Sequence, residues 1–351
     1  MTMLTEVRPE ELGRVELERW RAWQRATPAL ANPFLSPEFT LAVSRHRGSA
    51  MVAVMEDAFL PFERAGGGVG RAIGLGVSDC QGAVHAPGAR ISPDAILSGT
   101  GLAVWEFDHL VADQASAHRD VRPVGSPALD LSAGYQAYLD ARRPSSRKLV
   151  ASTERKARKL AREVGEVRLD YDCRDPKLLQ ALMDWKSAQY RRTGGDDRFA
   201  WPWLRGLVEE SFGTGDDSYR CLLSVLHAGD VPIAAHFGPR SGGVLSWWFP
   251  AYDTAYAAYS PGLILLLRLA EAAAADGIAT LDLGRGDNPY KASFASHEIP
   301  LAEGWVTRAS ARASLYRLRH VPPRAVRAFI VGNPALRQTA RRAKKLLARV
   351  R

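Results

Sequence analysis

The segment from Leu281 to Lys291 constrains the fold of this chain more than any other stretch. It opens with alternating apolar and polar residues, which predict the end of a strand, and it breaks at Gly284 and Gly286. Two acids, two cations and a tyrosine crowd this turn. Because α/β proteins commonly bind ligands where strands end, the segment predicts a functional loop in an α/β fold. A solvated loop with incidental charge is the alternative.

Length and composition narrow the class of protein. The 351 residues suit two domains better than one, and 46% hydrophobic with 24% charged residues is typical of a soluble globular protein. No apolar run approaches the ~20 residues that cross a bilayer. The N-terminus is acidic and polar, unlike a signal peptide, so we expect a cytoplasmic protein.

The cysteines and histidines predict neither disulfides nor a metal site. Cys80, Cys173 and Cys221 are widely spaced and form no CxxC motif, which fits a reducing compartment. The eight histidines show no HExxH or paired spacing. We therefore expect no bound metal.

The positive charge is concentrated at the C-terminus. The net charge is +9, yet the residues from Gly304 onward hold many Lys and Arg side chains and no acid. Within this tail, apolar residues at helical spacing predict a basic amphipathic helix. Such a helix suits the anionic inner face of a membrane, which would make the protein peripheral there. Nucleic acid, a cyclic dinucleotide or simple solvation of the helix are the alternatives.

Periodicity predicts alternating helices and strands in two units. We expect helices at 10–25, 36–46, 147–164, 175–190, 201–212 and 261–275, and strands at 51–62, 105–110, 167–171, 221–227, 233–238, 244–249, 278–283 and 305–313. Pro144 and the two serines after it suggest a linker. The expected domains are therefore 1–143 and 144–315, followed by a basic tail at 316–351.

A candidate anion site lies at the start of the helix predicted from Pro261. Ser260, Pro261 and Gly262 follow a sheet directly, and glycine lets a ligand approach the free backbone N–H groups of the first turn. This arrangement suits a pyrophosphate. Ser-Pro also caps many helices that bind nothing, so capping alone is the other interpretation.

Six motifs, in order, resemble the GNAT acetyltransferase superfamily, and within it the CelD-like branch linked to exopolysaccharide production. They are Ser78-Asp79-Cys80-Gln81-Gly82, Trp185-Lys186 with Gln189-Tyr190, Ala235-His236-Phe237, Trp248 to Asp253, Tyr259 to Gly262, and Asp282 to Lys291. The branch usually has an aromatic residue where Cys80 stands. The resemblance implies an α/β (α+β) fold of two tandem GNAT-like domains with mixed, largely antiparallel sheets, similar to the Fem transferases.

The same resemblance implies an acyl-CoA co-substrate, acetyl-CoA or another. The donor would lie between the strands at 244–249 and 278–283, and the helix from Pro261 would receive its pyrophosphate. Ser260, Pro261, Gly262, Trp248 and Arg285 are therefore the expected donor-binding residues.

The chemistry requires a neutral amine and stabilisation of an oxyanion. Candidates for the base are His236, Asp282 and Asp287, since a carboxylate in a partly buried turn can have its pKa raised. Asp287 could instead pair with Arg285, and His236 could be a core histidine. Tyr290 resembles the GNAT tyrosines that protonate the departing thiolate, and Lys291 would bind phosphate or the oxyanion, with packing at a helix start as the alternative for both.

Acceptor binding is expected from both units. Lys186 and Tyr190 share a helix face, and Asp79 and Gln81 could bind sugar hydroxyls. Tyr252 with Trp247 and Trp248 offers a stacking surface, beside Asp253.

The expected function is transfer of an acyl group to an amino sugar or lipid-linked saccharide in exopolysaccharide biosynthesis. One alternative is a Fem-like transferase that uses aminoacyl-tRNA. Another is a GNAT pair without catalysis that binds a signalling dinucleotide such as cyclic di-GMP.

Overall fold

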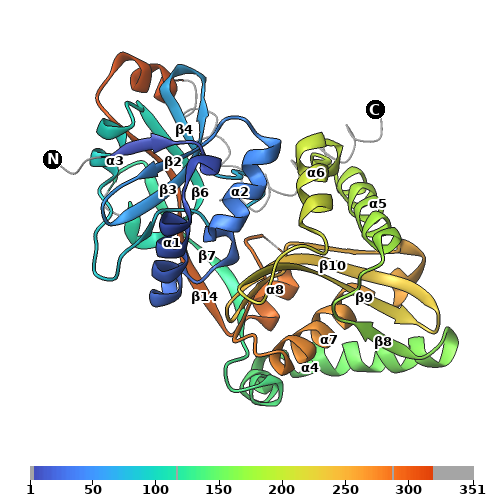
Figure 1. Cartoon of the computed structure of the whole chain (residues 1–351). Coiled ribbons are helices and arrows are strands. Elements are labelled where there is room, and N and C mark those ends of the chain that lie inside the picture. The colour runs from blue at the N-terminus through green and yellow to red at the C-terminus, as the bar shows by residue number, and fades with distance from the viewer. Residues whose placement is uncertain (1–3, 116–117, 287, 319–351) are drawn as a thin grey trace.

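A computed structural model describes residues 4–115, 118–286 and 288–318, and it shows two lobes that share one mixed sheet (Figure 1). The strand order is β1-β2-β3-β4-β6-β14-β7-β13-β11-β10-β9-β8, with β5 beside β3 and β12 beside β10. Most neighbours are antiparallel, whereas β4 with β6 and β11 with β13 are parallel. This architecture confirms the expected α/β fold class.

The first lobe contains the N-terminal helices and strands. Its helices are α1 (Arg14–Ala26), α2 (Pro37–His46) and α3 (Pro93–Gly99). Its strands are β1 (Thr5–Val7), β2 (Ala50–Val54), β3 (Ala58–Ala65), β4 (Val69–Ala72), β5 (Val84–His85), β6 (Val104–Val111) and β7 (Val121–Asp130). The predicted helix at 36–46 and the hairpin at 51–62 are confirmed.

The second lobe follows the predicted order closely. Its helices are α4 (Tyr135–Glu163), α5 (Pro176–Thr193), α6 (Pro202–Ser211), α7 (Pro261–Ala275) and α8 (Pro289–Phe294). Its strands are β8 (Val167–Asp170), β9 (Tyr219–Ala228), β10 (Val231–Ser241), β11 (Val244–Ser246), β12 (Phe249–Tyr252), β13 (Thr280–Asp282) and β14 (His297–Thr307).

Three sequence predictions differ from the structure. The linker at Pro144 is wrong, because α4 runs through it and the predicted boundary at 143/144 falls inside this helix. Packing of α4 on α7, with Glu154 bound to Arg268, outweighs the helix-breaking tendency of proline. The strand predicted at 305–313 is β14, which begins and ends earlier. The strand predicted at 244–249 is split at 247–248.

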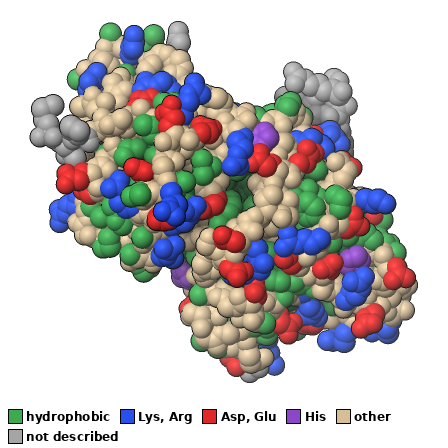
Figure 2. Space-filling model, in the orientation of Figure 1, with side chains coloured by type: hydrophobic (Ala, Val, Ile, Leu, Met, Phe, Trp, Pro, Cys, Tyr) green, Lys and Arg blue, Asp and Glu red, His purple; other side chains and the backbone are tan. Residues whose placement is uncertain are grey.

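The two lobes are joined by strands and by a common core. β14 comes last in the chain, but it pairs with β6 and β7 of the first lobe, and β7 also pairs with β13. Trp248 extends this junction, because its ring contacts Phe34 and Phe39 at centroid distances of 5.3 and 6.3 Å. Figure 2 shows a notch in the surface between the lobes. Among the described residues, no helix is long and apolar enough to cross a membrane.

Candidate active site at the lobe junction

Asp282 ends β13 and is the centre of the junction. Its side chain is 1% exposed and accepts hydrogen bonds from Ser126 Oγ at 2.5 Å, Asn32 Nδ2 at 3.0 Å and the Gly284 N–H at 2.9 Å. Burial raises the pKa of this carboxyl, and the three donors oppose the rise. Because its acceptor positions are occupied from both lobes, Asp282 is placed to hold the junction rather than to meet a substrate.

Lys291 fixes the loop that follows Asp282. Its Nζ donates to the carbonyl oxygens of Gly284 at 3.0 Å and Arg285 at 3.1 Å. Burial lowers the pKa of Lys291, and the charges of Asp79 and Asp282 oppose this effect. The predicted loop thus becomes a compact turn with a buried cation inside it.

Gly284 brings the two lobes into close approach. It has φ +68°, and a Cβ placed there would lie 2.8 Å from Asp79 Oδ2. Asp79 belongs to the first lobe, so the turn after β13 approaches a carboxylate from the other half of the chain. Only glycine fits both the backbone conformation and the space.

Asp79 is partly buried, and 20% of its side chain is exposed to solvent. Its Oδ1 is 3.9 Å from His109 Nε2, and His109 Nδ1 is 2.9 Å from Asp108 Oδ1. Burial raises the pKa of Asp79 to about 6, and Asp282 adds to the rise, whereas His109 and Lys291 oppose it. An accessible carboxylate therefore sits among buried charges of both signs.

Gln81, expected to bind sugar hydroxyls, is fully buried instead. Its Nε2 donates to Asp108 Oδ1 at 2.7 Å, and its Oε1 accepts from the N–H groups of Asp108 and His109. The amide is therefore used up within the protein. Gln81 orients Asp108, and no part of it faces an acceptor.

Lys186 and Tyr190 of α5 lie together, as the spacing predicted. Lys186 Nζ is 5.4 Å from the centre of the Tyr190 ring and donates to the Pro250 carbonyl at 2.9 Å. Burial lowers the pKa of Lys186 to about 7, and the charge of Lys291 lowers it further, while Asp79 opposes this. Lys186, Lys291 and Asp79 therefore lie near enough to one another for their charges to interact.

His236 faces the core. Its side chain has no exposed surface, its Nε2 lies 2.9 Å from the Ser246 carbonyl oxygen, and its ring stacks on Trp247 at 4.8 Å. Burial lowers its pKa to about 4. This environment favours the alternative of a core histidine over that of a base.

Trp247, Trp248 and Arg285 also bond within the protein. Trp248 Nε1 donates to the Val77 carbonyl at 2.6 Å, and both tryptophans are buried, which removes the expected stacking surface for a sugar or donor. Arg285 donates to the Asp108 carbonyl at 2.7 Å and pairs with Glu303 at 2.6 Å. Trp248 and Arg285 thus join the lobes, a role that the sequence did not indicate.

Tyr290, at the second position of α8, stays close to the donor strands. Its hydroxyl accepts a hydrogen bond from Trp247 Nε1 at 3.3 Å, and burial raises its pKa. A phenol with a raised pKa keeps its proton at neutral pH. It is therefore in the correct state to act as an acid.

The pairing of the two predicted donor strands ends near Trp247. β11 and β13 pair in parallel up to Ser246 and Asp282, and Trp247 N–H makes the next bond, to the Asp282 carbonyl at 2.7 Å. After Trp248 the chain pairs with β10 instead, as β12. The two strands therefore have different partners beyond this point.

The start of α7 lies close to a cation of α4. Ser260 has φ +54°, and its hydroxyl accepts a hydrogen bond from Lys156 Nζ at 2.7 Å. A Cβ added to Gly262 would meet nothing closer than the Tyr252 ring at 3.6 Å. Asp253 caps the short helix Thr254–Tyr259 by accepting from Ala255 N–H at 2.9 Å. A side chain at Gly262 would therefore lie against the Tyr252 ring at the first turn of α7.

Some predictions lie outside the described residues, namely the base role of Asp287 and the amphipathic helix of the tail. In the described part of the chain, no group of His, Cys, Asp or Glu could hold a metal. Sequence reasoning missed Asn32, Asp108, His109 and Ser126. The Asp108-His109 pair on a strand was the only signal available for them, and it has no recognisable spacing to the other site residues.

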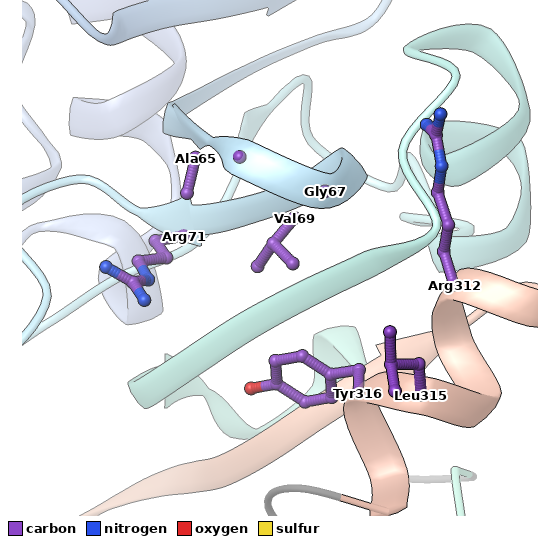
Figure 3. Close-up of a pocket in the computed structure, with 8 residues that line it drawn as sticks. Ala65, Gly67, Val69, Arg71, Arg312, Leu315 and Tyr316 are labelled. Carbon is purple, nitrogen blue, oxygen red and sulfur yellow. The ribbon is translucent and has the colours of Figure 1, made fainter.

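A separate pocket lies at the far side of the first lobe (Figure 3). Val69 and Arg71 of β4 line one side, and Arg312, Leu315 and Tyr316 from the residues after β14 line the other. None of the predicted site residues lines it, so its chemistry is independent of the lobe junction.

Comparison with known proteins agrees with this geometry. Residues 147–292 match the family model described as an acetyltransferase (GNAT) domain. No curated protein matches the sequence. Among solved structures, FemX has a TM-score of 0.59 at 11% identity, covering 90% of this chain and 99% of FemX. A protein of unknown function from Bacteroides thetaiotaomicron has a TM-score of 0.53 at 13% identity, covering 87% of this chain and 100% of the other. Residues 147–292 are thus similar to a GNAT acetyltransferase domain, which supports an acyltransferase, and most of the chain shares its fold with FemX and the Bacteroides protein.

Proposed function

We propose that this protein transfers an acyl group from acyl-CoA, acetyl-CoA in the simplest case, to an amino group on a sugar or sugar-linked precursor. The separation of β11 and β13 after Ser246 and Asp282 is the observation that carries the proposal. A thioester would extend one of these strands there by hydrogen bonding to its backbone, and the start of α7 lies on the same lobe, where its first N–H groups would receive the pyrophosphate.

The acceptor would approach from the first lobe. Asp79 is the exposed acid at the junction, and Lys186 and Tyr190 lie on the opposite lobe. Together they offer an anion, an amine with a pKa of about 7 and a phenol, which suits a polar acceptor with an amino group. Tyr290 would then donate a proton to the departing thiolate.

The assignment to exopolysaccharide synthesis rests on the resemblance to the CelD-like branch. We extend it to a cytoplasmic enzyme working beside the inner face of the membrane, where lipid-linked saccharides are assembled. The basic tail would provide contact with anionic lipid, and a cyclic dinucleotide is the competing partner.

A second candidate is a Fem-like transferase that uses aminoacyl-tRNA. The exposed cations of α4 favour it, because Arg147, Lys148, Arg155 and Arg158 form a basic stretch on a solvent-facing helix. Such a stretch suits phosphates of RNA. It also suits the phosphates of a nucleotide-linked sugar, so ligand binding must decide between them.

Calorimetric titration with acetyl-CoA and, separately, with bulk tRNA tests these proposals. We expect acetyl-CoA to bind and Gly262→Val to weaken it at least tenfold, because the added side chain would cover the first N–H groups of α7, where a Cβ only reaches van der Waals contact with the Tyr252 ring at 3.6 Å. Gly48→Val is the control, since a Cβ there meets nothing within 4 Å. Binding of tRNA but not acetyl-CoA would favour the Fem-like alternative, and binding of neither, together with binding of cyclic di-GMP, would favour the regulator.

A further inference from the structure

We propose that Asp79 is the general base that deprotonates the acceptor amine, and that His109 and Asp108 are positioning residues that hold it in its working state. This inference rests on the proposed function. It assigns the proton transfer to the first lobe, whereas the acyl donor would bind to the second lobe. Neither lobe alone would therefore hold all of the catalytic groups.

Geometry distinguishes Asp79 from the other buried acids of the junction. Its carboxylate keeps 20% of its surface exposed, and its contact within the protein is an ion pair to His109 at 3.9 Å rather than a set of short hydrogen bonds. Asp282, close by, is 1% exposed and accepts three hydrogen bonds. Asp79 thus has the access and the free acceptor capacity that a base needs.

Hydrogen bonds from neighbouring residues hold His109 and Asp108 in place. His109 Nδ1 lies 2.9 Å from Asp108 Oδ1, which sets the ring so that Nε2 faces Asp79. Gln81 binds the same Asp108 oxygen at 2.7 Å and also the backbone N–H groups of both residues. Arg285 donates to the Asp108 carbonyl from the other lobe. The imidazole therefore has one orientation, set by β6 and the loop after β13.

Charged groups from every surrounding element act on Asp79. Burial and the charges of Asp282 and Asp108 raise its pKa, whereas His109 and Lys291 lower it. Burial lowers the pKa of His109, but the hydrogen bond and charge of Asp108, with the charge of Asp79, raise it above the ordinary value. The positive charge that His109 carries when protonated therefore lowers the pKa of Asp79. From α5, Lys186 and Tyr190 lie close enough for the charge of Asp79 to raise the pKa of both groups.

The proton transfer balances without any added reagent. The Asp79 carboxylate takes one proton from the acceptor ammonium, which leaves a neutral amine. The amine forms a C–N bond to the thioester carbonyl carbon, the C–S bond breaks, and the thiolate of CoA takes the Tyr290 proton in the proposed scheme. The second amine proton, lost as the amide forms, restores Tyr290 through solvent, and Asp79 returns its proton to solvent through its exposed edge.

The test is the pH profile of acetyl transfer from acetyl-CoA to glucosamine, followed by release of the CoA thiol. We expect Asp79→Asn to lower kcat by about 10²- to 10⁴-fold. We expect His109→Gln to stay within a few-fold of the wild type at pH 8.5 but to fall at least tenfold below it at pH 6, because loss of the cation moves the acid limb to higher pH. The ratio of variant to wild-type kcat/KM at each pH cancels the titration of glucosamine itself. Asp108→Asn should lower the NMR titration midpoint of His109, because the hydrogen bond and charge of Asp108 raise the pKa of this imidazole.

His297→Gln, an exposed histidine on β14, is the control and should match the wild type at every pH. A His109→Gln ratio that does not vary with pH, or an Asp79→Asn variant that changes KM alone, would overturn the inference.

NMR titration of ¹⁵N-labelled histidines separates this failure from that of the proposed function. Asp79→Asn should lower the titration midpoint of His109 even in a protein that transfers nothing, and an unchanged midpoint would show that the two groups are uncoupled. A wild-type protein that neither binds acetyl-CoA nor transfers its acetyl group would overturn the proposed function, and the base role with it.

Discussion

Two aspartates at the lobe junction, Asp282 and Asp79, have opposite surroundings. Asp282 is covered and receives donors from its own loop and from the first lobe. Asp79 is partly open and faces a single imidazole. Both carboxyls have a raised pKa with burial as the largest cause, yet only one could bind a proton from a substrate. The difference teaches that a raised pKa marks a functional base only when access accompanies it.

Replacing Asp282 should have the largest effect on stability. We expect Asp282→Ala to lower the free energy of unfolding by about 3 kcal/mol, because Asn32 and Ser126 would be left buried without their acceptor. Urea denaturation measures the change. Asp282→Asn is the matched variant and should cost less, since its amide oxygen still accepts. Equal activity of a folded Asp282→Ala protein and the wild type would agree with a purely structural role, whereas unchanged stability would remove the contrast with Asp79.

Replacing Asp79 should raise the free energy of unfolding at neutral pH, whereas replacing Asp282 lowers it. A carboxyl whose folded pKa lies near 6, above its unfolded value of 3.8, binds more protons when folded, so its charge costs stability above pH 6 and this cost disappears as the pH falls toward 4. We expect Asp79→Asn to raise the free energy of unfolding by up to about 3 kcal/mol at pH 8, with the gain shrinking at pH 4.5. Thermal unfolding at the two pH values measures it. A loss of stability at pH 8 would show that the carboxylate holds the fold together, as Asp282 does.

Gly284 connects the two aspartates and offers a smaller perturbation. We expect Gly284→Ala to cost about 1–2 kcal/mol, because φ is positive and the new methyl group would press on Asp79. It should also lower acetyl transfer more than this stability loss explains. Activity and urea denaturation on the same sample separate the two effects. Gly277→Ala, which also has positive φ but open space, controls for backbone strain alone.

Replacing Ser126 tests how much one hydrogen-bond donor to Asp282 contributes to the free energy of unfolding. We expect Ser126→Ala to cost about 1 kcal/mol, since Asn32 and the Gly284 N–H still satisfy the carboxylate. Chemical denaturation should show this small shift with no change in the pH profile of activity. A shifted profile would mean that Asp282 and Asp79 titrate as one unit, and the proposed division of roles between them would fail.

The helices and strands of the second lobe could be predicted from periodicity, whereas the pairing of the lobes could not. The start of α7 follows from Pro261 and Gly262, and the β9–β10 hairpin follows from alternation around Gly229. Nothing local shows that β14 returns to β6, because strand partners are set by contacts far apart in the sequence. The sequence did not predict that α4 continues through Pro144 for a similar reason, because this helix packs on α7, which is far away in the sequence.

The candidate site divides along the same line. Lys186, Tyr190, Tyr290 and Lys291 could be chosen by residue type within motifs, and the structure brings them to the junction. Asp108 and His109 could not, because their importance depends on distance to Asp79. Gln81 and Trp248 were polar or aromatic residues in the right motifs, but Gln81 binds Asp108 within the first lobe and Trp248 donates to Val77 across the lobes.

The return of β14 to the first lobe has a consequence for how the protein is made. β7 has β14 on one edge and β13 on the other, so the first lobe lacks one of its inner strands until Thr307 has left the ribosome. The first lobe cannot complete its sheet before β14 has been made, and this long-range pairing predicts slow folding. Arg285, which binds Asp108 of β6 and Glu303 of β14, therefore gains its full set of partners only at that last step.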